Sequence, residues 1–402
     1  MAVHLSVPEF LLPIKGIRLA TINAGIRYKN RDDMVLIEAA EGSSVAAVFT
    51  RNAFCAAPVT VARAHLAQAP IRYLMINAGN ANAGTGSEGL AAATTTCEAL
   101  AQVAGVNTNQ VLPFSTGVIG VQLPVAKVTS ALPELVASLT EDNWMKAARA
   151  IMTTDTLPKG ISKQVSIGGQ TITITGIAKG AGMIHPNMAT MLSYIATDAQ
   201  VEASFLQQTL SSVVDDTFNC ITIDGDTSTN DALVLIATGA SGVAVGENEL
   251  ATFHAALKEV CLFLAQAIVR DGEGATKFID VQVEQARSRE EAHTVANTVA
   301  LSPLVKTALF ASDPNWGRIL AAVGRSPIDS LDVSRISIYL GDTLLVKGGQ
   351  PSPDYTEAQG QAETKKDEIK IRISLGRGDA VANVWTCDFS FDYVKINAEY
   401  RS

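Results

Sequence analysis

The sequence is poor in cysteine and histidine, with only five residues of each among 402. The cysteines are widely separated and include no Cys-x-x-Cys pair, and the histidines form no motif of metal-ligand spacing. These absences argue against a disulfide-stapled secreted domain and against a zinc site. Scattered, unpaired thiols are typical of reduced core cysteines, so we expect a cytoplasmic protein without a bound metal.

Positive charge and long apolar runs are also lacking. Only 18% of residues are charged and the net charge is −9, which argues against non-specific binding of nucleic acids or anionic membranes. No uncharged apolar run reaches about 18 residues, and the first residues, MAVHLSVPEFLLPIKG, contain no basic segment of a signal peptide. With 47% hydrophobic residues, the chain is expected to form one large globular domain or two.

Two stretches resemble ligand motifs but lack the residues that those motifs need. The loop NAGNANAGTG (77–86) contains neither GxGxxG nor GxxxxGK[ST], so we expect a close-packed turn before a helix and no phosphate site. The stretch NCITIDGDTSTND (219–231) spaces Asp224 and Asp226 as a calcium loop does. It lacks the glycine at the sixth position, and Leu235 replaces the bidentate Glu. Neither stretch predicts a cofactor.

Hydrophobic periodicity predicts a mixed α/β chain, with a division near residue 280 into a main part (1–280) and a C-terminal module (281–402). Predicted strands span 20–25, 34–39, 44–50, 72–77, 110–120, 191–195, 232–239, 279–283, 336–346 and 368–375, with a hairpin over 164–177. Predicted helices span 89–104, 124–139, 143–152, 202–216, 250–269 and 288–310, and residues 311–319 are predicted to form a turn.

The stretch KGAGMIHPNMATMLSYIATD (179–198) joins a glycine-rich segment and His-Pro-Asn to a threonine that opens an apolar strand. On these residues alone, Thr190 is most simply a β-branched residue with a structural role. The sharper interpretation is self-cleavage, in which Thr190 Oγ attacks the carbonyl carbon of Ala189 and water hydrolyses the resulting ester. The released α-amine, with a reference pKa of roughly 7.7–8.0, would then serve as base for its own hydroxyl group.

This stretch resembles the cleavage signature of the ornithine acetyltransferase family, many of whose members are bifunctional glutamate N-acetyltransferases. The resemblance extends over essentially the whole chain. It implies a layered α-β-β-α sandwich with a smaller C-terminal α/β module, and cleavage at Ala189-Thr190 into chains 1–189 and 190–402. It also implies that these chains stay packed in an α2β2 heterotetramer. The alternation of strands and helices is compatible with this fold but would not have identified it.

The resemblance also implies the residues of the site. Thr116 and Gly117, in QVLPFSTGVIG, match the pair that forms the oxyanion hole around the nucleophile Thr190. A carboxylate at Glu273 suits the cationic side chain of ornithine, and an ammonium at Lys179 would disfavour a second charge on the neighbouring amine. The implied substrate-binding residues are Thr153, Lys179, Thr190, Glu273, Asn397 and the terminal Ser402.

The reaction implied is transfer of the acetyl group from N2-acetyl-L-ornithine to L-glutamate through an acetyl-Thr190 enzyme, in arginine biosynthesis and without a cofactor. The residues leave open whether acetyl-CoA is a second donor. An alternative is a self-cleaving amidohydrolase, in which water resolves the acyl-enzyme. A further alternative is an uncleaved binding protein in which Thr190 is purely structural.

Overall fold

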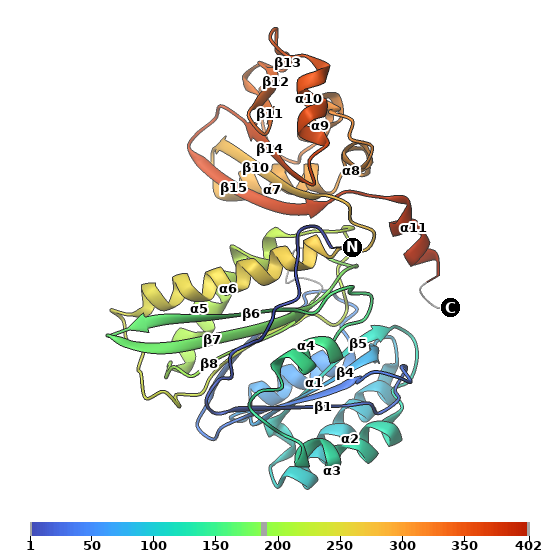
Figure 1. The fold of residues 1–402 in the computed structure, drawn as a ribbon, viewed down its shortest axis with the longest axis vertical. Coiled ribbons are helices and arrows are strands. Elements are labelled where there is room, and N and C mark those ends of the chain that lie inside the picture. The colour runs from blue at the N-terminus through green and yellow to red at the C-terminus, as the bar shows by residue number, and fades with distance from the viewer. Residues whose placement is uncertain (1, 186–190, 400–402) are drawn as a thin grey trace.

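The computed structural model describes residues 2–185 and 191–399. Three sheets and eleven α-helices lie within these residues. Figure 1 shows two stacked sheets with helices outside them, and a third sheet set apart at the C-terminal end. Three residues of the predicted site, Ala189, Thr190 and Ser402, lie outside the described residues.

The first two sheets pack face to face. The first has the order β1 (Ile17–Ile22), β2 (Met34–Ala39), β4 (Tyr73–Asn80) and β5 (Val111–Val118). The second has the order β3 (Ser44–Phe49), β9 (Ala232–Ala237), β8 (Leu192–Thr197), β7 (Gln170–Lys179) and β6 (Lys159–Ile167). The pairs β4–β5 and β8–β9 are parallel, and the other pairs in these sheets are antiparallel.

Alternating side chains of the second sheet serve two cores. In β8, Leu192 and Tyr194 enter the core between the sheets, whereas Ile195 enters the core on the opposite face. The ring of Tyr194 meets that of Phe114 from the first sheet edge-on, with centroids 5.4 Å apart. Because strand side chains point to alternate faces, a strand buried on both faces reads as a nearly continuous apolar run, as 191–195 does apart from Ser193.

Helices cover the outer face of each sheet. The helices α5 (Ala203–Asp215) and α6 (Leu250–Arg270) pack on the second sheet, and α2 (Gly86–Ala104) and α3 (Val125–Ala137) pack on the first. This order of layers confirms the predicted α-β-β-α sandwich (Figure 1). By length and composition α6 could cross a membrane, but much of it is buried in the core. The helices α1 (Ala57–Leu66) and α4 (Trp144–Ala150) contribute to the core between the sheets.

The third sheet has a core of its own. Its order is β13 (Gln350–Pro351), β12 (Thr343–Lys347), β11 (Ser337–Leu340), β14 (Glu368–Ser374), β10 (Phe278–Ala286) and β15 (Ala380–Cys387). The helices of this part are α7 (Arg289–Ala300), α8 (Pro303–Phe310), α9 (Trp316–Gly324) and α10 (Glu357–Thr364), and the last helix is α11 (Phe391–Ala398). Figure 1 shows α11 leaving this module toward the main sandwich.

The structure corrects several predicted elements. The turn predicted over 311–319 is wrong in its second half, because α9 begins at Trp316. The Asn315 side chain caps that helix by accepting a hydrogen bond from Arg318 N at 3.1 Å. The predicted strand 336–346 is two strands, which reverse direction at Gly341 with a φ of +53°. The first strand spans 17–22, not 20–25.

Candidate active site

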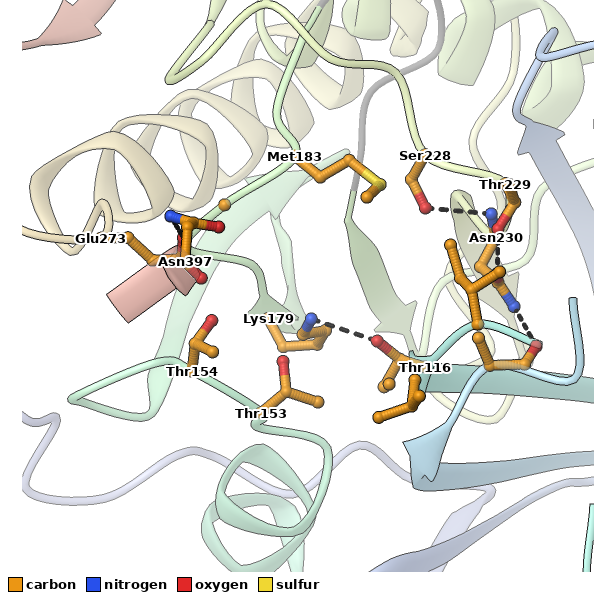
Figure 2. A pocket seen from close by; sticks show the side chains of 15 residues that line it. Thr116, Thr153, Thr154, Lys179, Met183, Ser228, Thr229, Asn230, Glu273 and Asn397 are labelled. Atoms are coloured by element: carbon orange, nitrogen blue, oxygen red, sulfur yellow. Dashed lines mark hydrogen bonds between the residues drawn. The ribbon is translucent and has the colours of Figure 1, made fainter. Parts of the chain in front are cut away.

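Side chains from segments far apart in the sequence line one cavity of about 270 Å³ at the ends of the two main sheets. The cavity is slightly smaller than the roughly 300–1,000 Å³ of sites for drug-sized ligands, a volume that suits an amino-acid derivative. Figure 2 shows Thr116, Lys179, Thr153 and Thr154 on one side and Glu273 with Asn397 on another. The full lining is Ala81, Thr116, Gly117, Val118, Ile119, Thr153, Thr154, Lys179, Gly182, Met183, Ser228, Thr229, Asn230, Glu273 and Asn397.

The end of β5 presents the hydroxyl group of Thr116 and the backbone of Gly117 to this cavity. Lys179 Nζ donates a hydrogen bond to Thr116 Oγ1 at 3.2 Å (Figure 2), so the hydroxyl hydrogen of Thr116 stays available to another acceptor. Gly117 has a φ of +136°, and a Cβ atom there would lie 2.2 Å from the carbonyl carbon of Gly79. Only glycine fits this backbone position.

Lys179 is buried, and burial lowers its pKa from the ordinary value of a lysine. The carboxylates of Asp155, Glu273 and Asp231 oppose this shift, and the charge of Lys159 reinforces it. A buried ammonium is retained only where charged or hydrogen-bonding partners surround it. Lys179 therefore lies among charges of both signs, next to the Thr116 hydroxyl group that it orients.

Glu273 is buried at the turn after α6, with 7% of its surface exposed. Its Oε2 accepts a hydrogen bond from Asn397 Nδ2 at 2.8 Å, which fastens α11 to the wall of the cavity (Figure 2). A Cβ atom at Gly182 would lie 2.4 Å from the same Oε2, so Gly182 gives the carboxylate room. The result is a fixed carboxylate at one end of the cavity, suited to a cationic ligand group.

A buried cluster of three charges, Lys159 with Asp155 and Asp271, joins the segments that carry the site. Lys159 Nζ lies 2.6 Å from Asp155 Oδ1 and 2.6 Å from Asp271 Oδ2, and no side chain of the three is more than 1% exposed. Asp155 also accepts hydrogen bonds from Gly180 N at 2.7 Å and from Thr153 N at 3.0 Å. This Lys159 cluster thus holds the segments of Thr153, Lys179 and Glu273 together.

Asp231 and Ala232, at the start of β9, hold Met191, the residue that precedes β8. The Asp231 carboxyl group accepts a hydrogen bond from the backbone N–H of Met191, and Ala232 N donates to Met191 O at 3.1 Å. Asp231 Oδ2 is buried without a hydrogen-bond partner within the described part of the chain. Burial raises the pKa of Asp231 well above its ordinary value, although the Met191 N–H and the Lys179 charge oppose the shift.

Asp224, within the stretch 219–231, also fixes the backbone of Met183 and Ile184. Asp224 accepts hydrogen bonds from Met183 N at 2.5 Å and from Ile184 N at 2.9 Å. Met183 has a φ of +56°, an uncommon conformation for a residue other than glycine. Asp224 therefore clamps a strained backbone. This is the role of an anchor.

All of the predicted site residues that the structure describes line the same cavity, namely Thr116, Gly117, Thr153, Lys179, Glu273 and Asn397. Sequence reasoning missed Thr154, Met183 and the Ser228–Asn230 segment. The polar stretch 219–231 was the signal for the last of these. Within residues 2–185 and 191–399, no group of three or more His, Cys, Asp or Glu side chains is arranged to hold a metal ion.

Comparison with known proteins identifies close relatives over the full length. A family model described as the ArgJ family matches residues 18–402. The arginine biosynthesis bifunctional protein ArgJ of Methylococcus capsulatus is 58% identical over 98% of this chain and 97% of that protein. The protein of the same name from Pseudomonas fluorescens is 55% identical over 100% of both. A crystal structure of ArgJ from Bacillus halodurans is 41% identical, with a TM-score of 0.50, over 52% of this chain and 99% of that chain.

Proposed function

This chain belongs to the ArgJ family, and from this premise we propose that it transfers the acetyl group of N2-acetyl-L-ornithine to L-glutamate in arginine biosynthesis. The chain first cleaves itself between Ala189 and Thr190. Thr190 then carries the acetyl group from the donor to the acceptor. Because one site serves both half-reactions, the kinetics are ping-pong.

The observation that carries this proposal is the convergence of six predicted residues, spread from position 116 to position 397, on a single cavity. Each brings a group that acetyl transfer needs: hydrogen-bond donors for an oxyanion, a carboxylate for an ammonium, and hydroxyl and amide groups for a carboxylate. Met191, which is bonded directly to Thr190, is held by Asp231 and Ala232 at the strand starts beside this cavity.

In the first half-reaction, Thr190 Oγ bonds to the acetyl carbon while its proton passes to the α-amine of Thr190. Negative charge develops on the former carbonyl oxygen, where the Thr116 hydroxyl and the Gly117 N–H stabilise it. Removing one donor of this kind typically costs about 3–4 kcal/mol. The carbon–nitrogen bond then breaks, and the departing amine of ornithine takes the proton. The α-amine of glutamate attacks the acetyl-Thr190 ester by the reverse sequence.

The charged residues divide the tasks of substrate binding. The Glu273 carboxylate, held by Asn397, pairs with the side-chain ammonium of ornithine. Lys179 acts mainly through Thr116, whose hydroxyl oxygen already accepts its hydrogen bond, so that the threonine donates its own proton to the oxyanion. Thr153 and the terminal Ser402 supply hydroxyl groups to the α-carboxylate that donor and acceptor share.

Intact-mass analysis under denaturing conditions tests this proposal. The wild-type protein is expected to separate into chains 1–189 and 190–402, and incubation with N-acetylornithine alone should add one acetyl group to the second chain. Glutamate should remove the acetyl group as N-acetylglutamate, whereas Thr190→Ala should remain one uncleaved chain. A Thr190→Ala protein in two fragments would contradict the assignment, and acetate release independent of glutamate would favour the amidohydrolase.

Further features follow from the same family membership. The Bacillus halodurans chain is matched over 99% of its length yet covers only 52% of this one, which supports a mature enzyme of two half-length chains. We propose that these assemble as an α2β2 heterotetramer in the cytoplasm. Acetyl-CoA is the proposed second donor, in keeping with the relatives' description as bifunctional. The separate core of the third sheet supports a module boundary near residue 280.

A further inference from the structure

The proposed oxyanion hole depends on one short stretch of backbone at the end of β5. Two donors from neighbouring residues, the Thr116 hydroxyl and the Gly117 N–H, must point at the same acetyl oxygen. Such donors are effective only when they are held in place before the reaction begins. Lys179 holds the Thr116 side chain through a hydrogen bond at 3.2 Å. The backbone of this stretch needs a support of its own.

Asn230 supports this backbone from the second sheet, and it lines the same cavity as Thr116 (Figure 2). Its Nδ2 atom donates hydrogen bonds to Ser115 O at 2.9 Å and to Ala81 O at 2.7 Å. Ser115 O belongs to the peptide group that precedes Thr116, and Ala81 directly follows β4, the strand paired with β5. One amide group therefore fixes the ends of two neighbouring strands beside the proposed oxyanion hole.

The donors of the Asn230 side chain are fully used by the protein itself. Both N–H groups of Nδ2 bind backbone carbonyls, and Oδ1 accepts a hydrogen bond from Thr229 Oγ1 at 2.6 Å. The residue is buried, with 6% of its surface exposed. A buried amide with these bonds made holds one orientation. Asn230 therefore suits the positioning of other groups, not the donation of a hydrogen bond to a substrate.

The two carbonyl oxygens explain why residue 230 is an asparagine. Both face the same side-chain atom, so that atom must carry two hydrogens. A carboxylate oxygen of aspartate in that place would repel both carbonyl oxygens, and a serine hydroxyl group has a hydrogen for only one of them. An apolar side chain would leave two carbonyl groups of the cavity wall without their partner.

The first sheet packs closely behind Gly117. A Cβ atom at Gly117 would lie 2.5 Å from Asn80 N. The Asn80 side chain donates hydrogen bonds to Val121 O at 3.1 Å and to Gln122 O at 3.2 Å, which ties the chain beyond β5 back to the end of β4. The asparagine-rich stretch 77–86 thus supports one face of the backbone whose other support is the amide from the second sheet.

Building on the proposed acetyl transfer, we propose that Asn230 is a positioning residue of the oxyanion hole. By holding the peptide group before Thr116, it sets the direction in which the Thr116 hydroxyl and the Gly117 N–H point. In this role it touches no reacting atom. Because both half-reactions place negative charge on the same acetyl oxygen, loss of this support should slow both of them and leave substrate binding unchanged.

Single-turnover acetylation by N-acetylornithine, followed by mass and expressed per molecule of chain 190–402, measures this role. Asn230→Ala should slow both acetyl-enzyme formation and its deacetylation by glutamate about tenfold to a hundredfold, because small displacements of reacting groups have effects of this size. The N-acetylornithine concentration at half-maximal rate should stay within about twofold of the wild-type value. Asn230→Ser, with one donor hydrogen instead of two, should fall between Asn230→Ala and the wild type.

A second measurement distinguishes positioning of the hole from a general disturbance of the fold. In a Thr116→Val background, where the hydroxyl to be oriented is already absent, Asn230→Ala should slow acetylation by a factor at least about threefold smaller than in the wild type. Asn143→Ala is the matched control, because the Asn143 amide also donates to a backbone carbonyl, Leu19 O at 3.0 Å, but outside the cavity. It should leave both half-reactions at wild-type rates.

Several outcomes would overturn the role of Asn230: an unchanged rate in Asn230→Ala, full additivity with Thr116→Val, a loss confined to one half-reaction, or a loss expressed only as weaker binding of N-acetylornithine. Absence of any acetyl-enzyme in the wild type would instead refute the transferase proposal itself. If Asn230→Ala yields no chain 190–402, Asn230→Ser decides: acetylation at the wild-type rate in that variant counts against the inference.

Discussion

The Lys159 cluster makes a sharp prediction about stability. Lys159→Met should remove the cation that contacts both Asp155 and Asp271, each at 2.6 Å and at most 1% exposed. Breaking a buried ion pair by removing one partner typically costs about 3–5 kcal/mol. Asp155 keeps two backbone N–H donors and Asp271 keeps Thr156 N at 2.9 Å. These remaining bonds place the expected loss at about 3–4 kcal/mol, a large part of the roughly 5–15 kcal/mol of a typical domain.

The loss is best measured by urea unfolding in a Thr190→Ala background, where the proposed cleavage is blocked and each protomer is one covalent chain. The matched control is Lys366→Met, because Lys366 pairs with Glu363 at 2.7 Å but is 57% exposed. A surface pair of this kind is worth about 0–1 kcal/mol. If Lys159→Met costs less than about 1 kcal/mol, or no more than the control, then the cluster does not stabilise the fold as argued.

The same cluster predicts how stability depends on pH. Burial opposes the ionisation of Asp155, but the charges of Lys159 and Lys179 outweigh it and hold the pKa of Asp155 well below its ordinary value. Between that lowered pKa and an unfolded value of about 3.9, the unfolded chain binds more protons than the folded one. The stabilisation is therefore complete above the unfolded pKa and is lost as pH falls through the folded pKa. The urea midpoint of Lys159→Met should fall less steeply below pH 5 than that of the parent.

Three further predictions concern the site. Thr116→Val should slow acetyl-enzyme formation about a hundredfold to a thousandfold by removing an oxyanion donor, whereas Thr116→Ser should largely restore the single-turnover rate; equal losses in the two variants would argue against the hydroxyl. Glu273→Gln should weaken N-acetylornithine about tenfold or more but leave N-acetylnorvaline, with its neutral side chain, nearly unaffected, and parallel losses in competition assays would contradict the pairing. Asp231→Leu should slow self-cleavage about tenfold or more, because the Met191 N–H loses its buried side-chain acceptor; wild-type ratios of cleaved to uncleaved chain on denaturing gels would refute this.

The sequence predicted the layers of the fold better than the contacts between them. Apolar runs such as 232–239 and 250–269 mark a buried strand and a long core helix, and the structure has both there. Helix α1 was not predicted, although Pro58 lies in its first turn. The turn predicted over 311–319 includes Pro314 and Gly317, which are typical of turns. The side-chain cap by Asn315 that starts α9 is a weaker signal than those two residues.

For the site, the resemblance to a family located the residues that line the cavity but not those that support them. Nothing in the sequence around Asp155 points to Asp271. Their link through Lys159 exists only because β6 begins beside the end of α6 in the folded chain. Similarly, the polar composition of the stretch 219–231 drew attention to it in the sequence. Its hydrogen bonds to Met183 and Met191 are tertiary contacts, which the sequence does not show.

These observations suggest a reason for burying so many charges around one small cavity. A site that exchanges a cationic amino acid for an anionic one must attract both without moving its nucleophile. Glu273 supplies a fixed negative charge at one end of the cavity. Lys179 lines the same cavity, and its Nζ donates a hydrogen bond that orients Thr116. The Lys159 cluster holds the segments of Thr153, Lys179 and Glu273 together, so we expect its loss to disturb the cavity as well as the stability of the fold.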